Sequence, residues 1–210
     1  MSADTHTSLF APLSSTYSPS QDLDVLKAMA RDLEMYLQSE IVYWQLSDAG
    51  PFTARNPSLT VGGLLLNLQR LSTLHVLLPS EEHTVYARVK NDLEGILDYW
   101  RANMERKAWS EIWVRMHSWE RYLEDCAKRP RFCVTSYPTD VYGRTYLQLL
   151  FDVISNHSST KRATSHLGYL DSQLRRIFVV DGFAWDAMLE PAFPKSKFWF
   201  LYGFLGSDPS

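Results

Sequence analysis

Apolar residues recur every three or four positions along most of this chain, and this spacing limits the folds it can adopt. The clearest example is one apolar face between 85 and 123, a segment that contains no proline. Steps of three and four place side chains on one side of an α-helix, whereas a half-buried strand alternates at every second residue. The sequence shows no sustained alternation and no internal repeat of fixed period. It therefore predicts an all-α fold, an antiparallel bundle of four to five long helices joined by short loops.

Prolines, glycines and capping residues divide this pattern into segments. The expected helices cover roughly 20–44, 58–78, 81–126, 138–156 and 161–179, with a short helix at 184–189. The third is the longest, and Gly95 is its only weak point, where a kink is allowed. We assign the bundle to residues 21–190 and expect a mobile arm at 1–20 and an aromatic docking tail at 191–210.

Composition and charge exclude several classes of partner. Hydrophobic residues make up 45% of the 210 positions, which is typical of a globular chain with a full core. The net charge of −3 provides no basic field, so we expect no nucleic-acid partner. Polar residues interrupt the longest apolar run, 61–78, so we interpret it as a buried helix and predict no transmembrane segment.

The start of the chain and its two cysteines bear on the compartment. The first residues, MSADTHTS, lack the basic and apolar regions of a signal peptide, and two cysteines give no disulfide framework. We therefore expect a cytoplasmic protein. In a reducing compartment Cys126 and Cys133 are most simply two free thiols, although their separation also allows a local disulfide.

Motifs that carry catalysis or bind metals are missing from the sequence. None of the six histidines follows a glutamate by three positions, and there is no His-x-x-x-His pair. The chain also lacks a phosphate-binding loop, a Gly-x-Ser-x-Gly elbow and a dinucleotide-binding glycine fingerprint. We predict no catalytic residues, no metal and no cofactor, and we favour a non-enzymatic role.

Four polar residues lie in or beside apolar helical faces, where a charge needs a partner. They are Glu40, Arg70, His75 and Arg144. One hypothesis is that they line an internal pocket for a small ligand, with an anion as one option. The alternative is a structural network that fixes how the helices align, and buried histidines and paired arginines are more often of this kind.

Aromatic residues make up 13% of the chain and gather at two places. Trp109 and Trp113 widen the apolar face of the third helix, and Phe198, Trp199 and Phe200 lie in the tail. Each group is either covered by the rest of the chain or exposed as a partner surface. Our leading functional hypothesis is a non-enzymatic protein that acts through protein–protein interaction or self-association, and the ligand-binding domain is the alternative.

The pair Gly62-Gly63 precedes a run of leucines at the start of the second helix. No lysine follows, so this is not a phosphate-binding loop. Each glycine costs a helix about 1 kcal/mol relative to alanine. We interpret the pair as a packing device that lets a neighbouring helix or a bulky ring, such as Tyr43 or Trp44, approach the backbone closely.

Overall fold

The structure is a computed structural model that describes residues 17–47, 58–154 and 158–206. Its α-helices are α1 (Pro19–Gln38), α2 (Val61–Leu74), α3 (Ser80–Tyr99), α4 (Arg101–Lys128), α5 (Pro130–Val153) and α6 (Ser158–Ile177). Three short 3-10 helices accompany them: η1 (His75–Leu77), η2 (Ala187–Ala192) and η3 (Trp199–Leu201). Strands β1 (Trp44–Gln45) and β2 (Ser58–Leu59) form one antiparallel pair, and β3 (Phe178–Phe183) and β4 (Tyr202–Leu205) form another. The all-α prediction is confirmed, although the described residues form more helices than the simple bundle that we expected.

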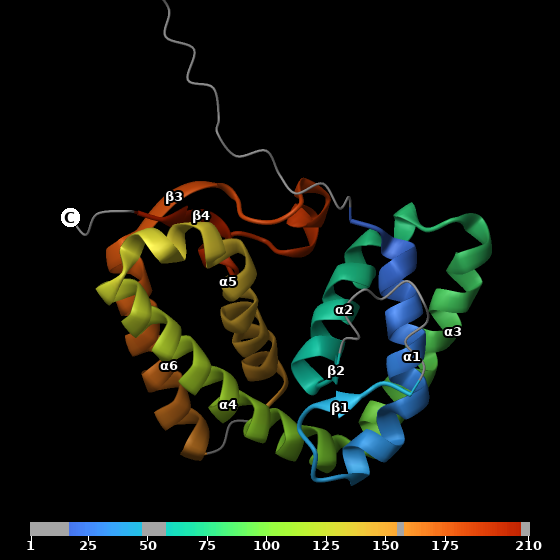
Figure 1. Ribbon diagram of the computed structural model, residues 1–210. Helices are drawn as coiled ribbons and strands as arrows, with labels where there is room; N and C mark the ends of the chain where they lie inside the picture. The colour runs from blue at the N-terminus through green and yellow to red at the C-terminus, as the bar shows by residue number, and fades with distance from the viewer. Residues whose placement is uncertain (1–16, 48–57, 155–157, 207–210) are drawn as a thin grey trace, which may run out of the picture.

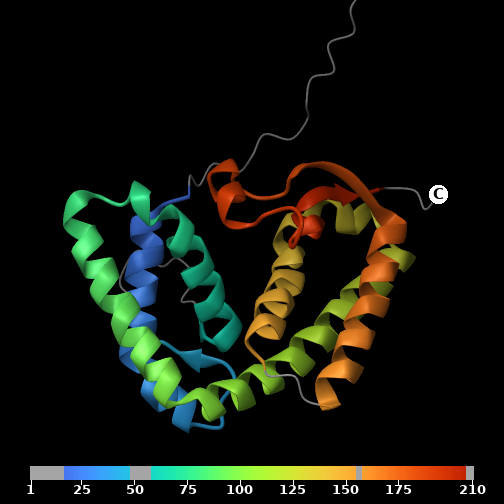
Figure 2. The same cartoon turned by 180° about the vertical axis from the view of Figure 1, so that it is seen from behind.

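Helix α4 joins the two halves of the molecule. It runs from the group formed by α1, α2 and α3 to the group formed by α5, α6 and the β3–β4 pair (Figures 1 and 2). Helix α2 packs against α5, so the two groups also meet directly. The core is continuous through both and is built largely from leucine side chains on the inward faces of the helices.

The predicted long third helix is broken at Trp100. Trp100 has φ −99° and ψ 26°, and it ends α3 and precedes α4. Gly95, where we allowed a kink, lies inside α3 with no atom near its missing side chain. The break lets α4 leave α3 and pack against α5 (Figure 1). Since neither proline nor glycine marks the break, tertiary packing and not local sequence sets its position.

Several helix ends also differ from the prediction. Helix α5 begins at Pro130 and continues through Pro138, although we expected one helix to end near 126 and the next to begin near 138. Proline at the first helical position loses no hydrogen bond, because that N–H has no partner within the helix. Helix α2 begins later than expected because the Thr60 hydroxyl accepts a hydrogen bond from the Gly63 N–H at 2.9 Å and caps it.

Cys126 and Cys133 form a disulfide, which contradicts our preference for two free thiols. The turn at Arg129 between α4 and α5 brings the two Cα atoms to 5.5 Å, a normal separation for a disulfide. The sequence separation of seven residues allowed this pairing. In the prediction the compartment argument outweighed this spacing.

The aromatic tail folds back on its own chain. Phe198 and Phe200 are fully buried, and the Tyr137 hydroxyl donates a hydrogen bond to the Phe200 carbonyl at 2.7 Å. Strand β4 pairs with β3 and lies against α5. Both views show this pair at one end of α5 and α6 (Figures 1 and 2). The predicted arm at 1–20 lies mostly outside the described residues, which begin at Tyr17.

Candidate ligand-binding site

A cavity of about 320 Å³ lies between α1, α2, α4 and α5, with β2 at its edge. We call it the polar pocket. Its lining comprises Asp22, Val25, Met29, Tyr43, Ser58, Thr60, Gly63, Leu66, Asn67, Arg70, Arg115 and Tyr146. These residues come from both halves of the sequence, and this cavity therefore exists only in the folded chain.

Arg70 reaches the polar pocket from α2. Its Nη2 donates to the Tyr142 hydroxyl at 3.1 Å, and its Nη1 lies 3.6 Å from Asp22 Oδ1. The guanidinium also lies over the rings of Tyr142 and Trp185, at 5.6 and 5.9 Å from their centroids. These contacts fix the orientation of the side chain but engage only some of its five N–H donors.

Arg115 reaches the same pocket from α4. Its Nε donates to Glu111 Oε1 at 2.6 Å, and its guanidinium lies 3.8 Å from the centroid of the Tyr146 ring. The Glu111 side chain is fully buried, and its other oxygen accepts a hydrogen bond from the Gly62 N–H at 2.9 Å. Glu111 thus holds Arg115 in place and joins α4 to the start of α2.

Two buried polar atoms in this pocket lack a hydrogen-bond partner among the described residues. They are the Nε of Arg70, a donor, and the Oδ1 of Asn67, an acceptor. Asn67 is only 6% exposed. Buried polar groups in folded proteins nearly always have partners, and leaving one without costs about 1–3 kcal/mol. The described residues therefore leave one donor and one acceptor on α2 without a partner beside this cavity.

Burial shifts the ionisation of two groups in the pocket. Desolvation raises the pKa of the Asp22 carboxyl, while the neighbouring Arg70 and a hydrogen bond from Tyr17 work against the shift. Burial also raises the pKa of the Tyr146 phenol, although Arg115 and Arg70 oppose the change. Tyr146 is therefore neutral at ordinary pH, and the ion pairs around the pocket are those of the two arginines with Asp22 and Glu111.

The structure does not bring the four predicted ligand residues together. Glu40 lies on the surface with its side chain 85% exposed and accepts two hydrogen bonds of 2.7 Å from Arg106. The ring of His75 stacks on Tyr86 with centroids 5.3 Å apart. Arg144 lies under the tail, in a buried ion pair with Asp171. Only Arg70 lines the polar pocket, so a shared network of the four is wrong, and each of the other three has a structural partner.

The predicted partner residues are mostly covered by their own chain. Phe198 and Phe200 are buried, Trp199 is partly buried beneath the guanidinium of Arg175, and Trp109 packs partly against the core. Trp113 differs, because 47% of its surface is exposed on α4. Of the two aromatic groups, only this residue offers a large apolar area to a partner.

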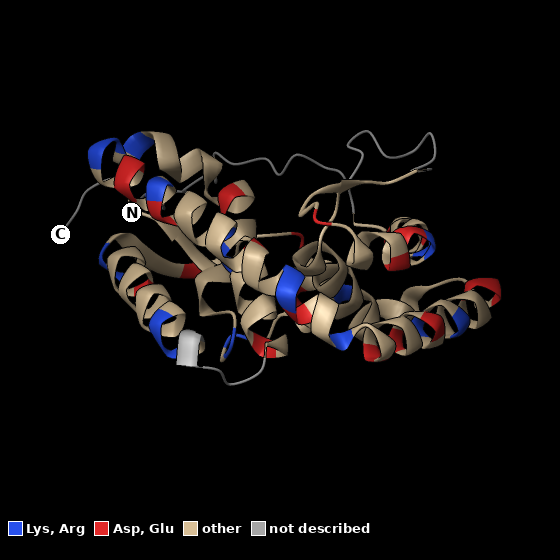
Figure 3. Ribbon diagram, turned by 90° about the horizontal axis from the view of Figure 1, so that it is seen from below, with Lys and Arg blue, Asp and Glu red and all other residues tan. Residues whose placement is uncertain are grey.

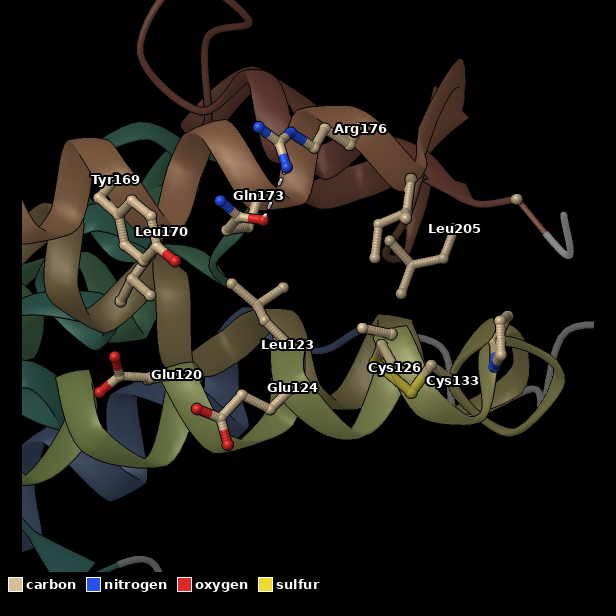
Figure 4. A pocket seen from close by; sticks show the side chains of 14 residues that line it. Glu120, Leu123, Glu124, Cys126, Cys133, Tyr169, Leu170, Gln173, Arg176 and Leu205 are labelled. Atoms are coloured by element: carbon tan, nitrogen blue, oxygen red, sulfur yellow. Dashed lines mark hydrogen bonds between the residues drawn. A yellow bond between two sulfur atoms is a disulfide. The ribbon is translucent and has the colours of Figure 1, made fainter. Parts of the chain in front are cut away.

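A second cavity of about 330 Å³ lies between α4, α6 and the end of β4. Figure 4 shows Leu123 and Leu170 facing each other across it, with the Cys126–Cys133 disulfide and Leu205 at one end. Glu120, Glu124 and Arg176 lie along its edges. Its lining is mainly apolar, and none of the buried polar atoms that lack a partner belongs to it.

Other kinds of site find no support in the described part of the chain. No group of three or more His, Cys, Asp or Glu side chains is placed to hold a metal ion there. None of the helices in residues 17–47, 58–154 and 158–206 has the length and apolar character to cross a membrane. Acidic and basic residues are mixed along the helices in Figure 3, in agreement with the small net charge.

The sequence prediction missed most of the polar pocket. Its lining residues Arg115, Tyr146, Asp22 and Asn67 were not among the predicted ligand residues. One available signal was the pair Glu111 and Arg115, spaced i and i+4 at the edge of the apolar face of α4. Nothing in the local sequence of α1 or α5 indicated that these helices contribute residues to the polar pocket.

Comparisons of this chain with models of protein families, with curated proteins and with solved structures found no match. Its function must therefore be inferred from the geometry of its own residues.

Proposed function

We propose that this protein binds a small organic molecule in the polar pocket and that the molecule's anionic group contacts Arg70 and Arg115. The observation that supports this most directly is a cavity lined by two arginine side chains, Arg70 and Arg115. Beside it, the buried atoms Arg70 Nε and Asn67 Oδ1 lack partners among the described residues. Binding needs no chemical step, in keeping with the absence of catalytic motifs.

The two arginines favour an anionic group for physical reasons. A guanidinium presents several N–H donors in one plane, which matches the two oxygens of a carboxylate. Arg70 and Arg115 are each held by an acid on one side, so further donors stay available without a change of side-chain conformation. The volume of about 320 Å³ is near the lower end for ligand pockets and indicates a small molecule.

Calorimetric titration of the full chain tests this proposal. The panel contains small carboxylates, amino acids and inorganic phosphate, and we expect saturable binding of at least one carboxylate-bearing member. Arg115→Lys keeps a positive charge beside the buried Glu111 but removes the planar guanidinium, so it should weaken that binding about tenfold. Arg121→Lys, at an exposed arginine on the same helix, is the matched control and should bind as the wild type does.

A second variant separates function from folding. Asn67→Leu replaces a buried amide whose oxygen lacks a partner, so we expect unfolding to become harder while ligand binding weakens. A more stable protein that binds as before would contradict the proposal. So would a wild-type protein that binds no member of the panel.

We also propose that the surface around Trp113 binds a protein partner. This keeps one part of our leading sequence hypothesis, protein–protein interaction or self-association, because Trp113 is the exposed residue of the two aromatic groups. An indole with 47% of its surface exposed is a common anchor of protein interfaces. The test is the mass in solution, measured by light scattering, and the presence of co-purifying proteins. Trp113→Ser should lower that mass or remove such a protein, and a monomer that is unchanged by the substitution would count against the surface.

A cytoplasmic location is likewise a proposal, and the disulfide weighs against it, since disulfides persist mainly in oxidising compartments. Alkylation of unreduced, denatured protein from its own host decides the matter. Two alkylated cysteines support a reducing compartment, and none supports an oxidising one.

A further inference from the structure

The polar pocket contains acceptors as well as donors, and this restricts its ligand further. Asp22 contributes a carboxylate, and Asn67 contributes the oxygen that lacks a partner. Asp22 and Asn67 belong to the residues that line this cavity together with Arg70 and Arg115. A ligand with only an anionic group would satisfy the arginines and leave these acceptors facing each other or the anion.

The charges of the pocket are already balanced without a ligand. Arg70 lies 3.6 Å from Asp22, and Arg115 lies 2.6 Å from Glu111, so two cations accompany two anions. Adding a simple anion would leave one uncompensated negative charge in a largely buried site, which is costly. A ligand that carries one positive and one negative group keeps the site neutral and uses both its donors and its acceptors.

The spacing of these groups indicates how close the two ligand charges must be. Asn67 and Arg70 are three positions apart on α2 and therefore on one face of the helix. Asp22 lies beside Arg70 on the facing helix α1. The acceptors and the donors are thus neighbours, which suits a molecule whose ammonium and carboxylate are attached to the same carbon atom.

The remaining wall of the pocket is apolar and accounts for the rest of the ligand. Val25 and Met29 contribute from α1, and Leu66 contributes from α2. Building on the ligand-binding function proposed above, we infer that the polar pocket binds a free α-amino acid with an apolar side chain. Its carboxylate contacts Arg70 and Arg115, its ammonium contacts Asp22 and Asn67 Oδ1, and its side chain lies against Val25, Met29 and Leu66.

Three compounds with the same carbon skeleton test this inference by calorimetry on the unmodified full chain. They are L-leucine, 4-methylpentanoate, which lacks the amine, and 3-methylbutylamine, which lacks the carboxylate. L-methionine and L-phenylalanine extend the series to other apolar side chains. We expect at least one of the three amino acids to bind, and we expect L-leucine to bind at least tenfold more tightly than either of its two analogues.

The outcomes distinguish this inference from the broader proposal. If 4-methylpentanoate binds as tightly as L-leucine, or if only carboxylates outside this series bind, the amino acid inference is wrong and the anion-binding function stands. If no carboxylate-bearing compound binds at all, both are wrong.

A pair of aspartate variants on α1 adds a second measurement. Asp22→Asn removes the charge that faces the ammonium, so the preference for L-leucine over 4-methylpentanoate should fall at least fivefold. Asp24→Asn is the matched control, because Asp24 is 73% exposed and pairs with Lys27 on the surface. A preference that is unchanged in folded Asp22→Asn protein would overturn the assigned contact, and the wild-type series stays decisive if that variant does not fold.

Discussion

Gly62 provides the sharpest test of how this fold is held together. It lies in the first turn of α2, where its N–H donates to the buried carboxylate of Glu111. A Cβ atom added to Gly62 would lie 2.7 Å from Glu111 Oε1 and 3.2 Å from the ring of Tyr146. The nearer distance is too short for ordinary contact. Glu111 cannot easily move away, because the same oxygen is bound to Arg115 at 2.6 Å.

The expected sign of Gly62→Ala follows from comparing two effects. Alanine favours a helix over glycine by about 1 kcal/mol. Against this, forcing a methyl group into a packed interior costs about 1–3 kcal/mol, and losing a hydrogen bond to a charged group costs about 1.5–3 kcal/mol. The unfavourable terms outweigh the favourable one. We therefore expect Gly62→Ala to destabilise the protein by about 2 kcal/mol.

Gly95→Ala is the matched control, because Gly95 is also helical and has no atom within 4 Å of its missing side chain. It should stabilise the protein by about 0.5–1 kcal/mol. For a chain of this size 1 kcal/mol shifts the melting temperature by about 2–4 °C, so thermal unfolding resolves both signs. The result that would falsify the reasoning is Gly62→Ala protein as stable as the wild type while Gly95→Ala behaves as expected.

Three further substitutions test other parts of the structure by chemical or thermal unfolding. Replacing Cys126 and Cys133 together by serine should lower the free energy of unfolding by about 2 kcal/mol, since their loop is short, and equal stability would mean that the disulfide does not form in solution. Asp171→Asn weakens the bidentate pair with Arg144 and should cost about 3 kcal/mol, and a change below 1 kcal/mol would contradict its burial. Burial tends to raise the pKa of Asp32, but hydrogen bonds from its neighbours outweigh this and lower the pKa below 3.8. Its stabilising effect is therefore complete above pH 3.8 and lost as the pH falls through the folded pKa, so Asp32→Asn should unfold with a weaker acid dependence than the wild type.

The sequence predicted the helices because their apolar faces are repeated many times. Ile112, Met116 and Trp119 are buried along α4 as their spacing required, and Leu33 and Leu37 are buried on α1. Each such residue independently indicates the same helical face, so the predicted fold class does not depend on any single position. A helix end is marked by only a few residues, which is why the start of α5 was predicted at 138 and not at Pro130.

The break at Trp100 and the polar pocket were not predictable for a different reason. No residue type marks either one. Trp100 occupies a position that the periodic pattern treats as one more apolar site in a continuous helix, and α4 departs there because it packs against α5. Asp22, Arg70 and Arg115 are separated by long stretches of sequence, and only the packing of α1, α2 and α4 makes them neighbours.

The glycine pair shows that local sequence can predict a close contact without identifying the residues that make it. The helix cost of Gly62 and Gly63 correctly predicted a compensating close contact, because a local penalty needs an offset elsewhere. Neighbouring helices do make that contact, but the two rings that we suggested were wrong. The Gly62 backbone is approached by a buried carboxylate from α4 and a ring from α5, and not by Tyr43 or Trp44. The carboxylate also holds Arg115 at the edge of the polar pocket. The absence of a side chain at Gly62 thus leaves room for Glu111, and through Glu111 it helps to position the arginine that we expect to contact the ligand.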